Sequence, residues 1–368
     1  MTQKLKLSCA VAALTVGVAA PALAEIKYEN ASGGSVQFYG QFSPAYISVD
    51  DGVSSTSEVV DNAHSGSRVG VKLLQPLGEG TFSFTFETSL GLRSSAGVSQ
   101  TSVPKGIDWD RTNLRKIDFA YKTASYGTFS VGQGSMATDG IAEADFGGTG
   151  MALYNGIGDA AGGFAFRTAA GALSGVTIGD VTPSLDGGRR GRVRYDSPDF
   201  NGFRVSVAAG TDVLNQNNSD DYYDVALRYG TEIGTTKVSG GVGFSRRERN
   251  GVDRDDTLGS VAVELQNGLN FAVAAGNRKG SGDYAYGKIG YNADFLKAGQ
   301  TSFGIDYYQG NDFNSVGSES KSYGVAVQQD IDSLNTQVYL GYRTYELTEV
   351  GTAYRDIDSV IFGARWRF

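Results

Sequence analysis

The chain has one histidine, His64, which lies close to Ser65 and Ser67. A histidine beside a serine hydroxyl is the pairing that nucleophilic hydrolysis uses, with the imidazole as general base. The residues around this pair do not form a nucleophile elbow or another flanking motif. We therefore expect His64 to be a solvated loop residue, and we retain a hydrolase as the enzymatic alternative.

Three groups of neighbouring carboxylates offer a different chemistry, the binding of a hard cation. They are Asp108 with Asp110, Asp220 with Asp221, and Asp253 with Asp255 and Asp256. Oxygen-rich loops can hold Ca²⁺, but the twelve-residue EF-hand spacing is absent here. We expect solvated loop charge at these positions, with structural Ca²⁺ as the alternative, and we expect no other cofactor.

Gly132, Gly134 and Ala137 follow a strand-like segment with the spacing of a dinucleotide-binding fingerprint. A dinucleotide-binding fold needs an amphipathic helix next and then a second parallel strand. Neither pattern follows in the sequence, so we do not expect a nucleotide cofactor.

The composition favours strands and excludes one class of partner. The chain has 40 acidic and 32 basic residues, which gives a net charge of −8. A generic nucleic-acid-binding protein has a basic excess, so we expect no nucleic-acid partner. The 52 glycines, 20 tyrosines and 19 phenylalanines stand beside only six prolines. These numbers are typical of many short strands joined by tight turns.

The first residues have the pattern of a cleavable export signal. Two lysines precede a mostly apolar run at residues 10–20, and a small-residue cleavage site ends at Ala24. The run is shorter than the ~20 apolar residues that a membrane-spanning helix needs. We predict a signal peptide at 1–24 and a single domain at 25–368. Cys9 would leave with the signal, and the mature chain would have no cysteine and a net charge of −10.

The C-terminal segment shows the clearest alternation of apolar and polar residues. Val360, Phe362 and Trp366 share one face, whereas Ser359 and Arg365 lie on the other. A period of two predicts a strand with one apolar face. Similar segments recur along the chain, and their second faces carry charges such as Glu87, Arg204, Asp306 and Arg365. A dry protein core would not accept these charges, whereas a water-filled lumen would.

No segment after residue 24 approaches the ~18 consecutive apolar residues of a helical span. A closed sheet, however, can pair every backbone polar group in lipid. We predict strands at 35–49, 67–75, 80–92, 114–123, 127–133, 190–196, 202–210, 221–229, 235–246, 256–265, 269–277, 284–291, 301–309, 321–329, 335–345 and 356–368. The predicted fold is all-β, a transmembrane antiparallel β-barrel of about 16 strands, large enough to keep an aqueous channel.

The predicted connections alternate between short and long. Those at 76–79 and 124–126 are short, whereas those at 50–66 and 93–113 are longer and polar. Outer-membrane barrels have short periplasmic turns and longer outer loops. We therefore place the short turns in the periplasm.

One connection, from about Gly134 to Arg189, is far longer than the rest. Insertions of this length are usually functional or disordered. The segment is rich in small residues with scattered apolar ones, as a loop folded against a wall would be. We expect it to be a third loop that folds into the bore.

Several short motifs occur in a particular order along the mature chain. They are Val36-Gln37-Phe38-Tyr39-Gly40, Ser67-Arg68-Val69-Gly70-Val71-Lys72, Tyr126-Gly127-Thr128-Phe129, Ala144-Asp145-Phe146-Gly147-Gly148 and the terminal Phe368. In these motifs the whole mature chain resembles the general diffusion porins of Gram-negative outer membranes. The resemblance implies a homotrimer of 16-stranded barrels, with the fourth motif in a loop that narrows each pore.

The resemblance also implies carboxylates on the loop side of the constriction and basic groups on the facing wall. The acidic candidates are Asp139, Glu143, Asp145 and Asp159, and Asp145 takes the place of the family's loop glutamate. Arg68 matches a wall arginine. A second wall arginine falls on Arg115 by count, whereas alternation along the strand turns Lys116 inward instead, so both remain candidates.

Two positions depart from the family pattern. The family's first-strand lysine is Gln41 here, and an arginine expected after Tyr195 is Asp196. The remaining basic candidates alternate on the polar face of one strand; they are Arg190, Arg192 and Arg194. Opposed charges would set up a transverse field across a narrow neck, but these departures leave the ion preference open.

We predict a non-enzymatic outer-membrane porin that forms a water-filled channel for passive diffusion of small hydrophilic solutes and ions. The expected partners are the lipid bilayer, lipopolysaccharide, small polar solutes and two further copies of the chain. A substrate-selective channel is the main alternative, and an aromatic ladder along the bore would favour it. A structural or adhesive barrel with a plugged lumen is a second alternative.

Overall fold

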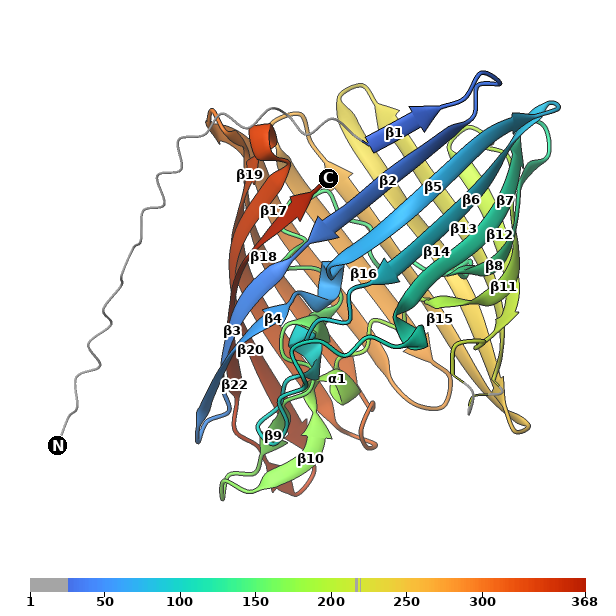
Figure 1. Ribbon diagram of the computed structural model, residues 1–368. Coiled ribbons are helices and arrows are strands. Elements are labelled where there is room, and N and C mark those ends of the chain that lie inside the picture. The colour runs from blue at the N-terminus through green and yellow to red at the C-terminus, as the bar shows by residue number, and fades with distance from the viewer. Residues whose placement is uncertain (1–25, 216–217, 219) are drawn as a thin grey trace.

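Figure 1 shows the computed structural model, which describes residues 26–215, 218 and 220–368. The predicted signal peptide at 1–24 lies outside the described residues. Within them, no helix has both the length and the apolar character needed to cross a bilayer.

The strands form one closed antiparallel sheet that surrounds a central space (Figure 1). Its members are β2 (Ser35–Phe42), β3 (Pro44–Asp50), β4 (Ser55–Asp61), β5 (Arg68–Leu77), β6 (Gly80–Ser89), β7 (Leu114–Thr123), β8 (Gly127–Ser135), β11 (Arg189–Asp196), β12 (Phe203–Thr211), β13 (Asp221–Ile233), β14 (Thr236–Arg249), β15 (Val252–Glu264), β16 (Leu269–Arg278), β17 (Asp283–Leu296), β18 (Gly299–Asn311), β19 (Glu319–Ile331), β20 (Thr336–Glu349) and β22 (Ile357–Arg367).

Two barrel strands are interrupted, so these 18 pieces make 16 barrel strands. β2 and β3 form the first strand, and β4 and β5 form the second, because β2 pairs with β5 and β3 with β4. β22 pairs with β20 on one side and with β2 and β3 on the other, which closes the ring. The sixteen-stranded antiparallel barrel predicted from the sequence is confirmed.

Smaller elements complete the structure. They are β1 (Ile26–Glu29), β9 (Ala165–Arg167), β10 (Leu173–Thr177), β21 (Thr352–Ala353), the helix α1 (Ile178–Val181) and the 3₁₀ turns at Ala63–Ser65, Ser95–Gly97, Arg111–Asn113, Ile157–Asp159 and Asp332–Leu334. The sequence pattern did not predict the four small strands. β1 extends the edge of β2, and β9 and β10 form a separate hairpin.

The predicted outer loop at 50–66 is wrong. β4 and a 3₁₀ turn occupy most of this range, and only residues 51–54 connect β3 to β4. The Asp61 carboxylate accepts hydrogen bonds from the backbone N–H and the hydroxyl of Ser67, at 2.7 and 2.6 Å. These bonds hold a kink within the second strand, and the polar residues of the kink resemble a loop in the sequence.

The two faces of the wall differ in polarity. Apolar side chains on the outer face are exposed, for example Val273 at 57%, Ile305 at 55% and Phe362 at 58%. Their neighbours along the strand point inward and are mostly polar or small. This alternation is the one predicted from the sequence, and it places the apolar face of each strand on the outside of the barrel.

A second apolar layer lies inside the barrel, between the wall and the segment 136–188. Phe164, Phe166 and Ile178 of this segment are fully buried in one cluster with Ile47 and Tyr345 of the wall. The segment therefore has its own core against the inner face of β3, β20 and β22.

Candidate functional site

The inner face of β5, β6 and β7 carries a group of charges around Glu87. Arg115 Nε lies 2.5 Å from Glu87 Oε1, and Arg68 Nε lies 3.7 Å from Oε2. The Tyr39 hydroxyl donates a hydrogen bond to the same carboxylate at 2.9 Å. The structure thus brings two predicted wall arginines together on one side of the bore.

The sequence left open whether Arg115 or Lys116 faces the inside of the barrel, and the structure shows how both can. Lys116 lies opposite Glu87 in the register, but Leu114 lies opposite Thr88, so Arg115 is an extra residue between two matched pairs. Such a β-bulge breaks strict alternation. Arg115 therefore reaches Glu87 while Lys116 also shares the inward face, and both predicted residues belong to the basic wall.

Arg189 joins this group, although the sequence analysis did not include it. Its charge interacts with those of Arg115, Glu87 and Asp139. Alternation with Val193 would turn Arg189 outward, but it is the first residue of β11 and directly follows the long segment. The run of four arginines between 189 and 194 was the signal that could have identified it.

The segment 136–188 hydrogen-bonds to inward-facing side chains around much of the wall. The bonded pairs include Thr138 with Asp224, Ile141 with Ser260, Phe146 with Asn292, Leu153 with Lys288, Met151 with Asn62, Pro183 with Tyr308 and Val181 with Ser320. Each of these wall groups lies on the polar face. The segment is thus fastened to the inner wall at residues 138–153 and 181–183.

Asp145 also binds the segment to the wall, through an ion pair with Lys288. Its carboxylate lies 2.6 Å from Lys288 Nζ, and the Lys288 side chain is only 1% exposed. A Cβ at Gly148 would collide with Ser302 Oγ, and one at Gly147 would lie 2.7 Å from Lys288 Cε. The two glycines therefore let the segment approach the wall closely enough for the ion pair. Asp145 anchors the segment, whereas the sequence analysis placed it among the constriction carboxylates.

The other acidic candidates lie together on the segment with Asp186, which the sequence analysis missed. Glu143 has an exposed surface but is enclosed by the barrel, and this burial raises its pKa to about 8, with further increases from Asp186 and Asp139. Burial raises the pKa of Asp186 to about 6, although backbone N–H groups of the segment partly offset it. Burial also raises the pKa of Asp159, to about 7.

The three arginines predicted on β11 have different surroundings. Arg192 makes a bidentate ion pair with Asp118, at 2.8 and 2.9 Å, and Arg194 makes one with Asp196. Arg190 instead places its guanidinium 4.1 Å from the ring centroid of Tyr222. Two of the three charges are thus balanced locally, and only Arg190 lacks a carboxylate partner among the described residues.

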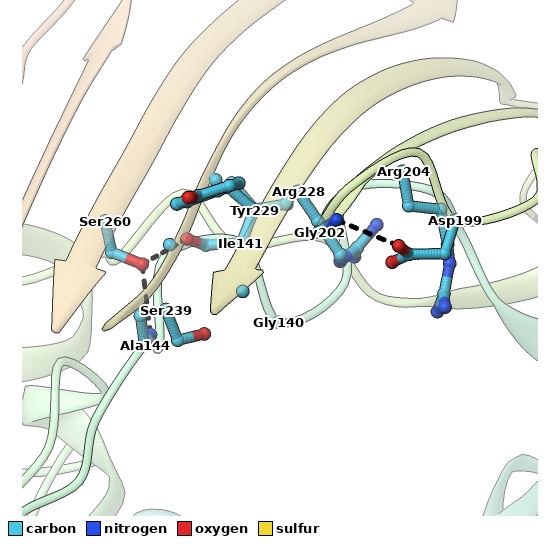
Figure 2. Close-up of a pocket in the computed structure, with 13 residues that line it drawn as sticks. Gly140, Ile141, Ala144, Asp199, Gly202, Arg204, Arg228, Tyr229, Ser239 and Ser260 are labelled. Carbon is cyan, nitrogen blue, oxygen red and sulfur yellow. Dashed lines mark hydrogen bonds between the residues drawn. The ribbon is translucent and has the colours of Figure 1, made fainter. Parts of the chain in front are cut away.

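A polar pocket of about 280 Å³ lies beside the first turn of the segment (Figure 2). Arg204 and Arg228 line it from β12 and β13, where they lie directly opposite each other in the register. Arg228 donates hydrogen bonds to the Asp139 carbonyl and the Ser206 hydroxyl. Gly202 belongs to the turn between β11 and β12, so the pocket faces the barrel end with the short turns.

Comparison with known proteins identifies the family. A family model described as Gram-negative porin matches residues 10–349. The chain belongs to the Gram-negative porins. This porin therefore lies in the outer membrane and provides a channel for passive diffusion of small hydrophilic solutes and ions.

Solved structures share the fold of this porin at low sequence identity. The anion-selective porin from Comamonas acidovorans is 14% identical, with a TM-score of 0.61, and the match covers 91% of this chain and all of that one. Pseudomonas putida OprB is 9% identical, with a TM-score of 0.61, and 90% and 94% of the chains are covered. OmpT of Vibrio cholerae in a trimer form is 16% identical, with a TM-score of 0.57 and coverage of 91% and 99%. No curated protein sequence matches the chain.

The sequence analysis expected His64 to lie in a solvated outer loop, and this prediction is wrong. His64 belongs to the 3₁₀ turn between β4 and β5, and its ring centroid lies 3.5 Å from that of Tyr154 on the segment 136–188. The kink in the second strand turns His64 inward against the segment. This porin thus uses its histidine for packing.

Several acidic side chains considered for Ca²⁺ bond to arginines. Asp220 pairs with Arg249, Asp255 with Arg246 and Asp256 with Arg278, and Asp110 caps a 3₁₀ turn. Within the described ranges no group of three His, Cys, Asp or Glu side chains has an arrangement suited to a metal ion. A structural Ca²⁺ in these loops stays a prediction.

Proposed function

We propose that solutes cross this porin through a constriction between the carboxylates of the segment 136–188 and the basic wall. The loop side consists of Asp139, Glu143 and Asp186, with Asp159 behind them. The wall side consists of Arg68, Arg115, Lys116 and Arg189. The observation that carries the proposal is the position of Arg189, which begins β11 directly after the segment and lies within electrostatic range of both Glu87 on the wall and Glu143 on the segment.

We further propose that the constriction prefers anions. Four basic groups lie around Glu87 on the wall, and their charges repel one another. Asp118 also attracts Lys116, but it is paired with Arg192. Glu143, Asp159 and Asp186 have pKa values raised to about 8, 7 and 6, which reduces their combined negative charge near neutral pH. The neck then has a net positive field, which attracts anions and repels cations. The name of the Comamonas porin agrees with this preference, although its likeness supports the fold alone.

The reversal potential in a KCl gradient across a planar bilayer tests this proposal. We expect the sign of the reversal potential to show a preference for chloride over potassium, and we expect Arg115→Gln to reduce this preference. Lys297→Gln is the matched control, because Lys297 is exposed in a short turn away from the neck. A potassium preference, or an equal response of both variants, would contradict the proposed constriction.

The inward tyrosines do not favour a substrate-selective channel. The segment 136–188 covers four buried tyrosines, Tyr284, Tyr308, Tyr339 and Tyr345. Tyr284 bonds to Asn155, Tyr308 to Pro183 and Tyr345 to Ile157. Tyr339 bonds to Asn62, which in turn bonds to Met151. Aromatic rings under the segment cannot form a ladder along the solute path. We therefore propose a general channel without an enzymatic centre.

We also propose that the porin is a homotrimer whose exposed apolar wall contacts lipid and lipopolysaccharide. The trimer form of Vibrio OmpT supports the assembly, and the exposed valine, isoleucine and phenylalanine side chains support the lipid contact. Native mass spectrometry from mild detergent would test the trimer. A monomer at all concentrations would contradict it.

A further inference from the structure

Three arginines gather around one tyrosine on the inner face, and one of them, Arg190, directly follows Arg189 of the proposed constriction wall. Tyr222 of β13 lies opposite Arg247 of β14, which lies opposite Arg254 of β15. Residues directly opposite each other in antiparallel strands share a face. Arg190 of β11 places its guanidinium 4.1 Å from the Tyr222 ring centroid. We call Arg190, Arg247 and Arg254 the arginine row.

The arginine row faces inward near the barrel end with the longer connections. Tyr222 is 8% exposed, and its neighbours Tyr223 and Val225 occupy the outer face. Arg247 and Arg254 lie within a few residues of the β14–β15 hairpin tip at 250–251. The row therefore borders the path of a solute before it reaches the segment 136–188.

Opposed like charges in a sheet repel each other, so the pair Arg247 and Arg254 calls for a counter-charge. The two nearest carboxylates already serve other arginines. Asp220 makes bidentate bonds of 2.7 Å with Arg249, and Asp256 makes bidentate bonds of 2.8 and 3.1 Å with Arg278. Both carboxylates are thus occupied by arginines outside the row.

The row retains hydrogen-bond donors without acceptors. Arg247 Nε lies 3.7 Å from Asp220, and Arg254 Nε lies 3.2 Å from Asp256, but neither makes a hydrogen bond. Arg190 Nε is also buried without a partner among the described residues. Buried donors in native proteins nearly always have an acceptor. Three guanidinium groups with free donors therefore suit a ligand that brings several acceptor oxygens and negative charge.

We propose that the arginine row is a binding site for small multivalent oxyanions, with the phosphate group as the fitting chemistry. A phosphate group has enough oxygens to accept from all three guanidiniums, whereas chloride offers one point charge. The site would collect such anions at the outer mouth of the channel. This inference deepens the proposed function and rests on an open channel, but it does not depend on the selectivity of the constriction.

Inorganic phosphate is the probe for the test. In planar bilayers with KCl at constant ionic strength, phosphate added to either side should reduce the chloride current along a saturable curve. In Arg247→Gln/Arg254→Gln the half-blocking phosphate concentration should rise roughly tenfold, the ratio expected for the loss of about 1.4 kcal/mol in charged hydrogen bonds. Unchanged block in this variant would overturn the proposal.

Arg246→Gln is the matched control. Arg246 is the neighbour of Arg247 on the same strand, but it pairs with Asp255 on the outer face. The control loses the same charge at the same height, so its phosphate block should equal that of the native protein. An equal loss in both variants would mean that phosphate responds only to overall charge, which would overturn the site.

Arg190→Gln provides a second variant in case the double substitution fails to fold. Arg190 has no carboxylate partner to leave unpaired, and its removal should weaken phosphate block while the barrel stays resistant to unfolding in cold detergent. The reversal potential in KCl separates the two proposals. If the channel prefers potassium but phosphate block still depends on these arginines, only the proposed constriction is contradicted. If the channel prefers chloride but phosphate block does not depend on these arginines, only the proposed phosphate site is contradicted.

Discussion

Two ion pairs on the inner wall have nearly the same geometry and opposite surroundings. Arg343 lies 2.6 Å from Asp306, and Arg115 lies 2.5 Å from Glu87. The first pair is 5% and 0% exposed beneath the segment 136–188, whereas in the second pair Glu87 is 5% exposed and Arg115 is 23% exposed. The difference teaches that the segment decides the role of a charge. We propose that pairs under the segment hold the structure together, and that pairs left uncovered at the constriction act on solutes.

The largest expected effect comes from breaking the covered pair. Arg343→Met would leave Asp306 as an unpaired buried carboxylate, which costs about 3–5 kcal/mol of unfolding free energy. Urea unfolding in detergent would measure the loss. The double variant Arg343→Met/Asp306→Asn should recover most of it, and a single variant as stable as the native porin would contradict the structural role.

A smaller loss should follow when Lys288 is replaced. Lys288→Met removes the anchor of Asp145, whose side chain is 19% exposed and can regain water. Losing one charged hydrogen bond should cost about 2 kcal/mol. Limited proteolysis would then cut the segment 136–188 faster, while the chloride preference should change little. A large change in selectivity with an intact segment would place Asp145 in the solute path after all.

The carboxylates of the segment 136–188 should make selectivity depend on pH. Glu143, Asp159 and Asp186 have raised pKa values between about 6 and 8. They lose protons as the pH rises through this range, and the added negative charge should lower the chloride preference. One unit charge about 7 Å from the ion path in water-like surroundings amounts to ~0.6 kcal/mol, or about a threefold change in permeability ratio.

Reversal potentials measured from pH 5 to pH 9 would record this titration. Glu143→Gln should flatten the upper part of the curve and raise the chloride preference at pH 9. A curve without inflection between pH 5 and pH 9 would show that these carboxylates do not face the permeating ions.

The smallest effect should come from an ion pair that is neither covered by the segment 136–188 nor part of the proposed constriction. Lys237 lies 2.8 Å from Glu264, but its side chain is 51% exposed. Exposed ion pairs contribute little because water screens them. Lys237→Ala should therefore change neither the unfolding curve nor the reversal potential, and a clear change in either would weaken the distinction by coverage.

The sequence predicted the barrel well because alternation is a local signal. All sixteen barrel strands were found, and the polar faces of most were correct, since each strand repeats the same pattern of period two. The pattern failed where a kink or a bulge interrupts the regular strand. The Asp61 bonds to Ser67 kink the second strand, and the bulge at Arg115 turns two successive basic residues inward.

The candidate site was predicted only in part, because partners far apart in sequence determine it. Asp306 was expected in a wet lumen, but its pairing with Arg343 lies beneath the segment 136–188. Asp145 was expected at the constriction, but Lys288, 143 residues further along, holds it at the wall. Neither partner could be read from the neighbouring residues of the sequence.

The last bond of the barrel wall joins residues near opposite ends of the chain. Gly40 and Phe368 exchange backbone hydrogen bonds of 2.9 and 3.1 Å, and β1 continues along the edge of β2 beyond this point. A contact of such long sequence separation forms late, because a large loop must close first. Without β22, the wall would present an open sheet edge to lipid, where unpaired backbone groups are costly. Closure of the wall in the bilayer therefore depends on pairing between segments that lie far apart in the sequence.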